Sequence, residues 1–143
     1  MGKEIKTAAV RWVEGLEFEA ITGSEHRLTL DANVKAGGQN HGPSPMELLL
    51  VGLAGCTGMD IVDVLKKKRQ EVTGLEVRVE GTRAETYPMV YTDIQVTYVV
   101  RGKNVSQKAV EDAIQLSETK YCSASAMLGK AARITSRYEV LPE

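Results

Sequence analysis

The chain has 143 residues, of which 43% are hydrophobic, and 18 basic against 19 acidic side chains leave a net charge of −1. A chain of this length and apolar content can bury a core of its own, so we expect one domain spanning residues 1–143. The balanced charge gives no electrostatic reason to expect nucleic acid or an anionic membrane surface as a partner.

The N-terminus carries no apolar signal region, and the longest apolar run, residues 48–54, is too short to span a bilayer. We therefore expect a cytoplasmic protein that is not inserted in a membrane. Its two cysteines, Cys56 and Cys122, should then be reduced at rest. A permanent structural disulfide is not expected, whereas a cycling one is compatible with that compartment.

Residues 5–31 are predicted to form three short strands. Leu16, Phe18 and Ala20 alternate with acidic residues, which is the period of a half-buried strand, and glycine-containing turns separate the strands. This meander has few large apolar residues and needs a partner surface from this chain or from a second copy. The glycine-rich residues 32–44 then form a loop without regular structure.

A long helix is predicted to follow over residues 45–70. Ser44 is its N-cap, Pro45 lies in the first turn, and Glu47 completes a capping box with the serine. The helix is apolar almost all round as far as Asp60, so we expect it to be buried in the centre of the molecule.

Three glycines recur in this helix at intervals of three residues, namely Gly52, Gly55 and Gly58. Each glycine weakens a helix by about 1 kcal/mol relative to alanine, so a close approach of another backbone is the usual reason for such a row. Cys56 lies directly beside this smooth surface.

The rest of the chain alternates between strands and helices. A strand over 75–80 and a returning strand over 94–100 are predicted to form a hairpin, an amphipathic helix starts near 105, a short helix ends at Gly129, and a last strand covers 134–140. The predicted order is βββ-α-ββ-αα-β, which is an α+β domain with an antiparallel-rich sheet.

Among chemistries available to this chain, thiol redox fits best. The two cysteines and the two histidines, His26 and His41, lack the close spacing of a metal site, and no phosphate-binding glycine motif or nucleophile elbow is present. His41 precedes Cys56 by 15 residues, so a papain-like thiol–imidazole pair is a weaker option. Backbone N–H groups at a helix start would favour the thiolate of Cys122. On spacing alone, both cysteines can equally be small buried hydrophobes.

Two motifs together carry a resemblance to a known family. Residues 43–50 lead into a Gly-Leu-Ala-Gly sequence and Cys56, and Tyr121-Cys122-Ser123 with Met127-Leu128 follow much later. The chain resembles the OsmC/Ohr family of thiol-dependent peroxidases over nearly its whole length. The resemblance implies an intertwined homodimer in which residues 1–31 pack on the partner subunit. The long central helices would lie back to back, with active sites at the interface.

The same resemblance implies a reaction. Cys56 would attack an organic hydroperoxide and become a sulfenic acid, and Cys122 would resolve it as a disulfide. A dithiol, such as a lipoylated protein, would then reduce the disulfide. An apolar pocket between subunits would favour alkyl or fatty-acid hydroperoxides. No cofactor and no metal are expected.

The glutamate and the arginine that would activate the Cys56 thiolate are harder to assign from the resemblance. In characterised members a glutamate follows the helix-opening proline and an arginine comes from the N-terminal strands. Here Met46 has that position and Glu47 is one residue further, so Glu47 is either a catalytic residue or only part of the capping box. Arg11 is the first candidate for the arginine and Arg27 the second. Two alternatives remain open: a non-enzymatic dimer that binds a small apolar ligand at the subunit interface, and a different thiol chemistry on an electrophile.

Overall fold

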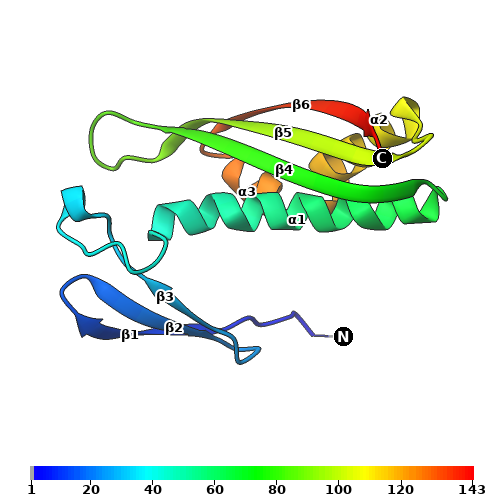
Figure 1. Ribbon diagram of the computed structural model, residues 1–143. Coiled ribbons are helices and arrows are strands. Elements are labelled where there is room, and N and C mark those ends of the chain that lie inside the picture. Colours follow the sequence, from blue (N-terminus) through cyan, green and yellow to red (C-terminus); the bar gives the residue numbers. More distant parts are fainter. Residues whose placement is uncertain (1) are drawn as a thin grey trace. The chain divides into compact units, whose positions relative to one another are not determined.

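The computed structural model describes residues 2–143 and has the predicted α+β order (Figure 1). The strands are β1 (Ala8–Glu14), β2 (Glu17–Thr22), β3 (Arg27–Leu30), β4 (Glu71–Arg83), β5 (Tyr91–Lys103) and β6 (Arg133–Pro142). The helices are η1 (Val34–Ala36), α1 (Pro45–Lys67), α2 (Gln107–Leu116), η2 (Ser117–Tyr121) and α3 (Ser123–Leu128). The chain forms two compact units, Met1–Leu49 and Leu50–Glu143. The single domain expected from the length stays a prediction.

The N-terminal unit is built on an antiparallel sheet in the order β1-β2-β3. In its register Val10 lies opposite Ala20, which in turn lies opposite Leu28. Every residue of β1 is exposed, and within the strands of this sheet Ala20 is the buried residue. As the sequence predicts, the meander buries little apolar surface by itself.

The loop after this sheet contains one short element that the sequence analysis did not expect. A single 3-10 turn, η1, begins because the Asn33 side chain accepts the N–H of Ala36 at 2.8 Å. It ends at Gly37, whose φ of 97° is in the left-handed region that glycine enters without strain. The prediction of no regular structure was therefore wrong for this turn.

The C-terminal unit is built on a second sheet in the order β4-β5-β6. Strands β4 and β5 form the predicted antiparallel hairpin, and β6 pairs with β5 in parallel. In this register Tyr98 on β5 lies between Val77 on β4 and Tyr138 on β6. A parallel neighbour needs a long crossover connection, which α2, η2 and α3 provide.

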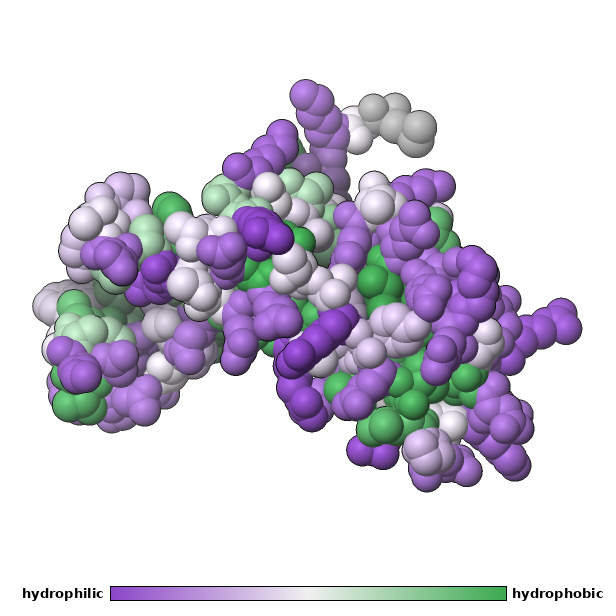
Figure 2. Space-filling model, turned by 90° about the horizontal axis from the view of Figure 1, so that it is seen from above, coloured by the Kyte–Doolittle hydropathy of each residue, from purple (hydrophilic) through white to green (hydrophobic). Residues whose placement is uncertain are grey.

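The core of the C-terminal unit lies between this sheet and the helices on one of its faces (Figure 1). Alternate residues of β5 point to that face, and they meet side chains of α1 and α2 that exclude solvent almost completely. The largest fully buried apolar side chains are Leu53, Ile61, Leu65, Ile94, Val96, Tyr98, Val100 and Val110. In Figure 2, hydrophilic residues predominate on the visible surface, with hydrophobic areas scattered among them.

Helix α1 is shorter and less buried than the sequence analysis predicts. It ends at Lys67, and Arg69 adopts a left-handed φ of 58° where residues 45–70 were expected to be helical. One face is buried, with Leu53 and Ile61 at its centre, but the opposite face is open: Met59 is 76% exposed. An all-round apolar pattern does not say whether each face is covered by its own chain.

With 23 residues and a mean hydropathy of 1.9 in its most apolar window, α1 is long and apolar enough to cross a membrane. The apolar part of α1 is therefore longer than the run 48–54, which by itself is too short to span a bilayer. The core helix of a water-soluble domain passes the same test, and the buried face of α1 carries Thr57, hydrogen-bonded to Tyr98 and Ser117. We interpret α1 as a core helix.

Candidate active site

The two cysteines lie together in the C-terminal unit. Cys56 is in the middle of α1 and half-buried, and Cys122 follows η2 and is 3% exposed. Both are free thiols, and Cys56 is near enough to Cys122 to raise the pKa of its thiol. The structure thus brings together the two residues predicted as a redox pair, one within reach of solvent and one enclosed.

A widened helical turn sets the position of Cys122. Residues Ser117–Tyr121 form a π-helical turn, η2, in which the N–H of Cys122 donates to the carbonyl of Ser117 at 2.8 Å. Cys122 is then the N-cap of α3, and its Sγ accepts the N–H of Ser125 at 3.3 Å. The sequence predicts a break here but not a π turn, a rare feature that often occurs at functional sites.

Burial raises the pKa of the Cys122 thiol to about 11. The Ser125 N–H lowers this pKa, as expected at a helix start, but the neighbouring Cys56 and the charge of Asp60 raise it further. The predicted effect of the helix start is thus present, but desolvation outweighs this one backbone donor and the net pKa of the thiol is raised. At neutral pH Cys122 is a protonated thiol.

A chain of buried hydroxyl groups lies beside the thiols and ends in two carboxylates. Thr57 Oγ1 contacts Ser117 Oγ at 2.7 Å and the Tyr98 hydroxyl at 3.1 Å. Ser117 donates to Asp60 Oδ2 at 2.9 Å, and Tyr98 donates to Glu118 Oε2 at 2.7 Å. Burial raises the pKa of the Tyr98 phenol above its ordinary value. We call these five side chains the hydroxyl chain.

Sequence reasoning missed the hydroxyl chain, although α1 carries a signal for it. Thr57 and Asp60 are the polar residues one and four positions after Cys56 in an otherwise apolar stretch. Residues four apart lie on the same helical face, so Asp60 belongs to the face of Cys56. The partners Ser117 and Tyr98 come from distant elements and could not be assigned.

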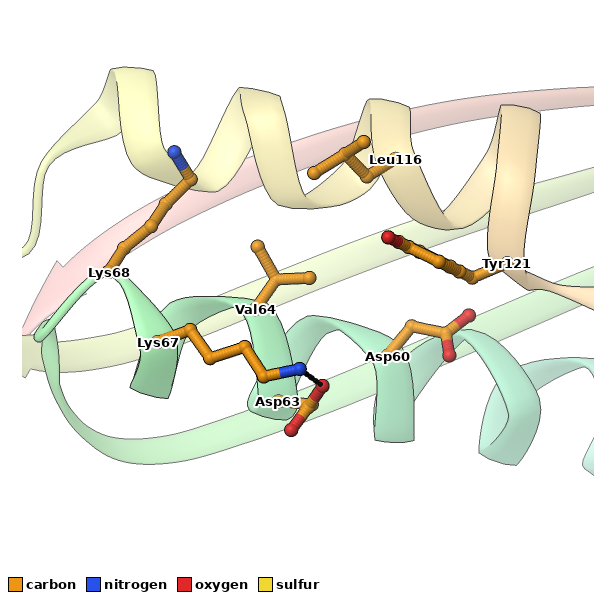
Figure 3. A pocket seen from close by; sticks show the side chains of 7 residues that line it. All are labelled: Asp60, Asp63, Val64, Lys67, Lys68, Leu116 and Tyr121. Atoms are coloured by element: carbon orange, nitrogen blue, oxygen red, sulfur yellow. Dashed lines mark hydrogen bonds and ion pairs between the residues drawn. The ribbon is translucent and has the colours of Figure 1, made fainter.

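A pocket of about 350 Å³ opens next to Asp60 (Figure 3). It lies between α1 and the turn from α2 into η2, and its lining residues are Asp60, Asp63, Val64, Lys67, Lys68, Leu116 and Tyr121. In Figure 3 the carboxylate of Asp60 points toward Tyr121, the residue before Cys122, and Lys67 is held by Asp63 at 2.9 Å. The pocket therefore gives solvent a way to the Asp60 end of the hydroxyl chain.

Glu47 lies in the N-terminal unit and forms the capping box. Its Oε1 accepts the N–H of Ser44 at 2.9 Å, and its own N–H donates to Ser44 Oγ at 3.2 Å. The Ser44 N–H holds the pKa of Glu47 below its ordinary value. The capping prediction is confirmed, and a catalytic role of Glu47 stays a prediction.

The two candidate arginines are both in the N-terminal sheet. Arg11 lies on the exposed strand β1, opposite Glu19 on β2. Arg27 forms an ion pair with the same glutamate at 3.0 Å. Because Arg27 is engaged there, Arg11 remains the first candidate for the cation, and its role at the thiol stays a prediction.

One cluster in the N-terminal unit has the composition of a metal site. Glu17, Asp31 and His41 offer ligand atoms within 4.8 Å of one another. The buried Asp31 already accepts the N–H groups of Ala32, Gln39 and His41, and His41 Nδ1 is 2.7 Å from Glu17 Oε1. These contacts account for the cluster as the fastening of the loop after β3.

An apolar groove runs along the open face of α1. It measures about 760 Å³ and lies between this helix and β4, with Val51, Met59 and Val62 among its lining residues. A Cβ atom added at Gly52 or Gly55 would meet no atom within 4 Å. The row of helical glycines is therefore not explained by a neighbouring backbone of the same chain.

One family and two relatives match most of this chain. The family described as OsmC-like protein matches residues 37–137. Protein YhfA of Escherichia coli K12 is 40% identical over 134 residues, which cover 94% of this chain and 97% of that protein. A crystal structure of a hypothetical protein from Aquifex aeolicus is 35% identical with a TM-score of 0.87, and 99% of each chain is covered.

The organic hydroperoxide resistance protein OhrB of Bacillus subtilis has the same fold at greater distance. It is 18% identical with a TM-score of 0.64, over 95% of this chain and 98% of that one. An identity this low is evidence for the fold alone.

Proposed function

The chain belongs to the OsmC-like family, and from this premise we propose that it is a thiol-dependent peroxidase that reduces organic hydroperoxides through Cys56 and Cys122. The observation that carries the proposal is the proximity of two free thiols, one half-buried and one enclosed, with Cys56 among the neighbours that raise the pKa of Cys122. A pair in contact supports a disulfide that can form and be reduced again. The substrate class is part of this proposal and follows the name of a protein with the same fold, the organic hydroperoxide resistance protein OhrB.

In the first step Cys56 is the attacking thiol, because it is the more accessible sulfur of the pair. Its thiolate attacks the terminal oxygen of ROOH, the O–O bond breaks, and the alcohol ROH leaves with a proton. Cys56 is thereby oxidised to a sulfenic acid, and the hydroperoxide is reduced by two electrons.

In the second step Cys122 resolves the sulfenic acid. Its sulfur forms the S–S bond with Cys56, the S–O bond breaks, and the departing hydroxide is protonated to water. An external dithiol, such as a lipoylated protein, then returns both cysteines to thiols and is itself oxidised to a disulfide. The raised pKa of Cys122 agrees with these two roles, because a protonated Cys122 does not compete with Cys56 for the hydroperoxide in the first step.

We extend the proposal to a cytoplasmic homodimer in which a second subunit covers the open face of α1. The exposed Val51 and Met59 and the unobstructed Gly52 and Gly55 support close packing of another helix there. A dimer would also turn the apolar groove into an enclosed binding space, which favours alkyl over hydrogen peroxide substrates. Native mass spectrometry tests the assembly, and a clean monomer at micromolar concentration contradicts it.

The test of the activity is turnover of cumene hydroperoxide with a dithiol reductant. Cys56→Ser should abolish turnover, whereas Cys122→Ser should still consume about one equivalent of peroxide and leave a sulfenic acid that dimedone traps. Non-reducing mass spectrometry of the wild type after peroxide should show an internal disulfide. Turnover that survives Cys56→Ser refutes the mechanism.

A second candidate function is binding of a small apolar ligand without chemistry, and the groove along α1 is the observation that favours it. In that case fatty acids should bind with the same affinity to the wild type and to Cys56→Ser, and peroxide should leave both thiols reduced.

A further inference from the structure

The hydroxyl chain has four contacts between oxygen atoms but only three hydroxyl protons to fill them. Its three hydroxyls carry one proton each, and its two carboxylates carry none when ionised. Ser117 donates to Asp60 and Tyr98 donates to Glu118, so both of these protons are engaged at the ends. Thr57 has a single proton for two neighbours, Ser117 and Tyr98.

The distances show which of these contacts has no proton between its two oxygens. Thr57 lies 2.7 Å from Ser117 but 3.1 Å from Tyr98, and the latter is the longest contact in the chain. A proton that arrives on Asp60 would fill this gap: Asp60 donates to Ser117, Ser117 turns to Thr57, and Thr57 turns to Tyr98. Every contact then holds one proton, and hydrogen bonds in such a row strengthen one another.

The end that would take this proton lies beside the thiols. Asp60 follows Cys56 by one helical turn on the same face of α1, and its charge acts on the Cys122 thiol. Ser117 connects the two groups, because its hydroxyl donates to Asp60 while its carbonyl accepts the N–H of Cys122. The carboxylate is also open to solvent through the pocket in Figure 3.

Of the two carboxylates that end the hydroxyl chain, Asp60 and Glu118, it is Asp60 that can accept a proton from the thiols. Several titratable groups surround Asp60. They are Cys56, Asp63 and Lys67 on α1, Lys68 directly after this helix, Tyr121 at the end of η2, and Cys122. Both lysines have acidic partners of their own, since Lys67 pairs with Asp63 and Lys68 with Asp112. At the other end, Glu118 accepts from Tyr98 on β5 and from Ser136 on β6.

Building on the proposed function, we propose that Asp60, with the hydroxyl chain behind it, accepts the proton of the Cys122 thiol when that thiol attacks Cys56. The S–S bond forms as the S–O bond of the sulfenic acid breaks, so that Cys122 is oxidised and Cys56 is reduced. The thiol proton passes to Asp60, and the hydroxide that leaves takes a proton from solvent to become water. Asp60 then returns its proton to solvent through the pocket or by way of Glu118.

The attack can be measured without any peroxide. Dithionitrobenzoate should label the accessible Cys56, and attack by Cys122 on this mixed disulfide then releases the second thionitrobenzoate, whose absorbance is followed. In Asp60→Asn the amide can donate to Ser117 but cannot take a proton. We expect release to be slowed about a hundredfold at neutral pH, and the deficit should vanish as pH approaches 11, where Cys122 ionises unaided.

The sign of this effect separates proton transfer from simple electrostatics. Removing the negative charge of Asp60 by itself favours the Cys122 thiolate and would speed the attack. Thr57→Val, which cuts the chain, should also slow release, and Thr57→Ser should restore it. Thr22→Val, an exposed threonine of the N-terminal unit, should retain the wild-type rate, and Cys122→Ser should show no second release.

Release from Asp60→Asn at or above the wild-type rate at neutral pH overturns the proposal, as does a Thr57→Val rate equal to that of Thr57→Ser. Because the assay contains no hydroperoxide, it is independent of the proposed activity. An Asp60 deficit in a protein that turns over no hydroperoxide would support the proton acceptor and refute the peroxidase.

Discussion

The two compact units of this chain are stabilised in different ways. In the C-terminal unit a long helix and a central strand bury an apolar core with almost no exposed surface, and the thiols and the hydroxyl chain are set into it. The N-terminal unit has a three-stranded sheet with an exposed first strand, and its loop is fastened by hydrogen bonds to Asp31. The proposed chemistry, which depends on fixed geometry, thus lies where packing is dense, and the unit with little core is the one for which we expect a second surface.

The largest effect that distinguishes the units should come from a matched pair of isoleucines. Ile61 on α1 is 0% exposed and Ile5 in the N-terminal unit is 84% exposed. Ile61→Ala should lower the free energy of unfolding by about 3 kcal/mol, because it leaves a cavity in a core that cannot collapse fully. Ile5→Ala should change it by no more than about 0.5 kcal/mol. Urea denaturation measures both, and equal losses would show that the N-terminal segment is buried in the assembled protein.

A smaller effect is expected from two threonines in hydrogen-bonded groups. Thr57→Val removes the middle of the buried hydroxyl chain and leaves Ser117 without a donor, which should cost about 1–3 kcal/mol. Thr22→Val removes exposed contacts with Ser24 and with the N–H of His26, where water replaces the lost partner, and should cost less than about 0.5 kcal/mol. Thermal unfolding of the two variants makes the comparison. An unchanged unfolding temperature in Thr57→Val would mean that water, not Thr57, completes the hydroxyl chain.

Local sequence patterns predicted the elements well because their causes are local. The capping box of Ser44 and Glu47 starts α1 as expected, and the alternation around Val96 and Val100 correctly indicated a half-buried strand. These signals depend on neighbours within a few residues. Cys56 and Cys122 were paired only through a family resemblance, since their spacing alone left both a redox pair and two small buried hydrophobes open.

What the sequence could not supply depends on contacts between distant elements. The π turn before Cys122 coincides with the bond from Ser117 to Asp60, a partner 57 residues away, and no local rule predicts such a turn. The raised pKa of Cys122 likewise follows from burial, which outweighs the local helix-start effect that the sequence shows. Helix α1 was expected to be buried all round, because an apolar pattern does not show which chain covers each face.

The smallest effect, a dependence on pH, also differs between the units. The hydrogen bond and charge of Glu17 raise the pKa of His41 above its ordinary value. The pair therefore stabilises the N-terminal unit below about pH 6.5, the unfolded value, and this contribution is lost as pH rises through the higher folded value. In the C-terminal unit the pKa of Cys122 is raised to about 11, so stability is lost only at alkaline pH, as pH rises from the ordinary thiol value to 11.

Proton NMR titration of the His41 ring should show its pKa fall in Glu17→Gln, with Glu19→Gln as the control. An unchanged titration would mean that Asp31, rather than Glu17, sets the charge of His41, and that the loop is fastened by its backbone hydrogen bonds alone.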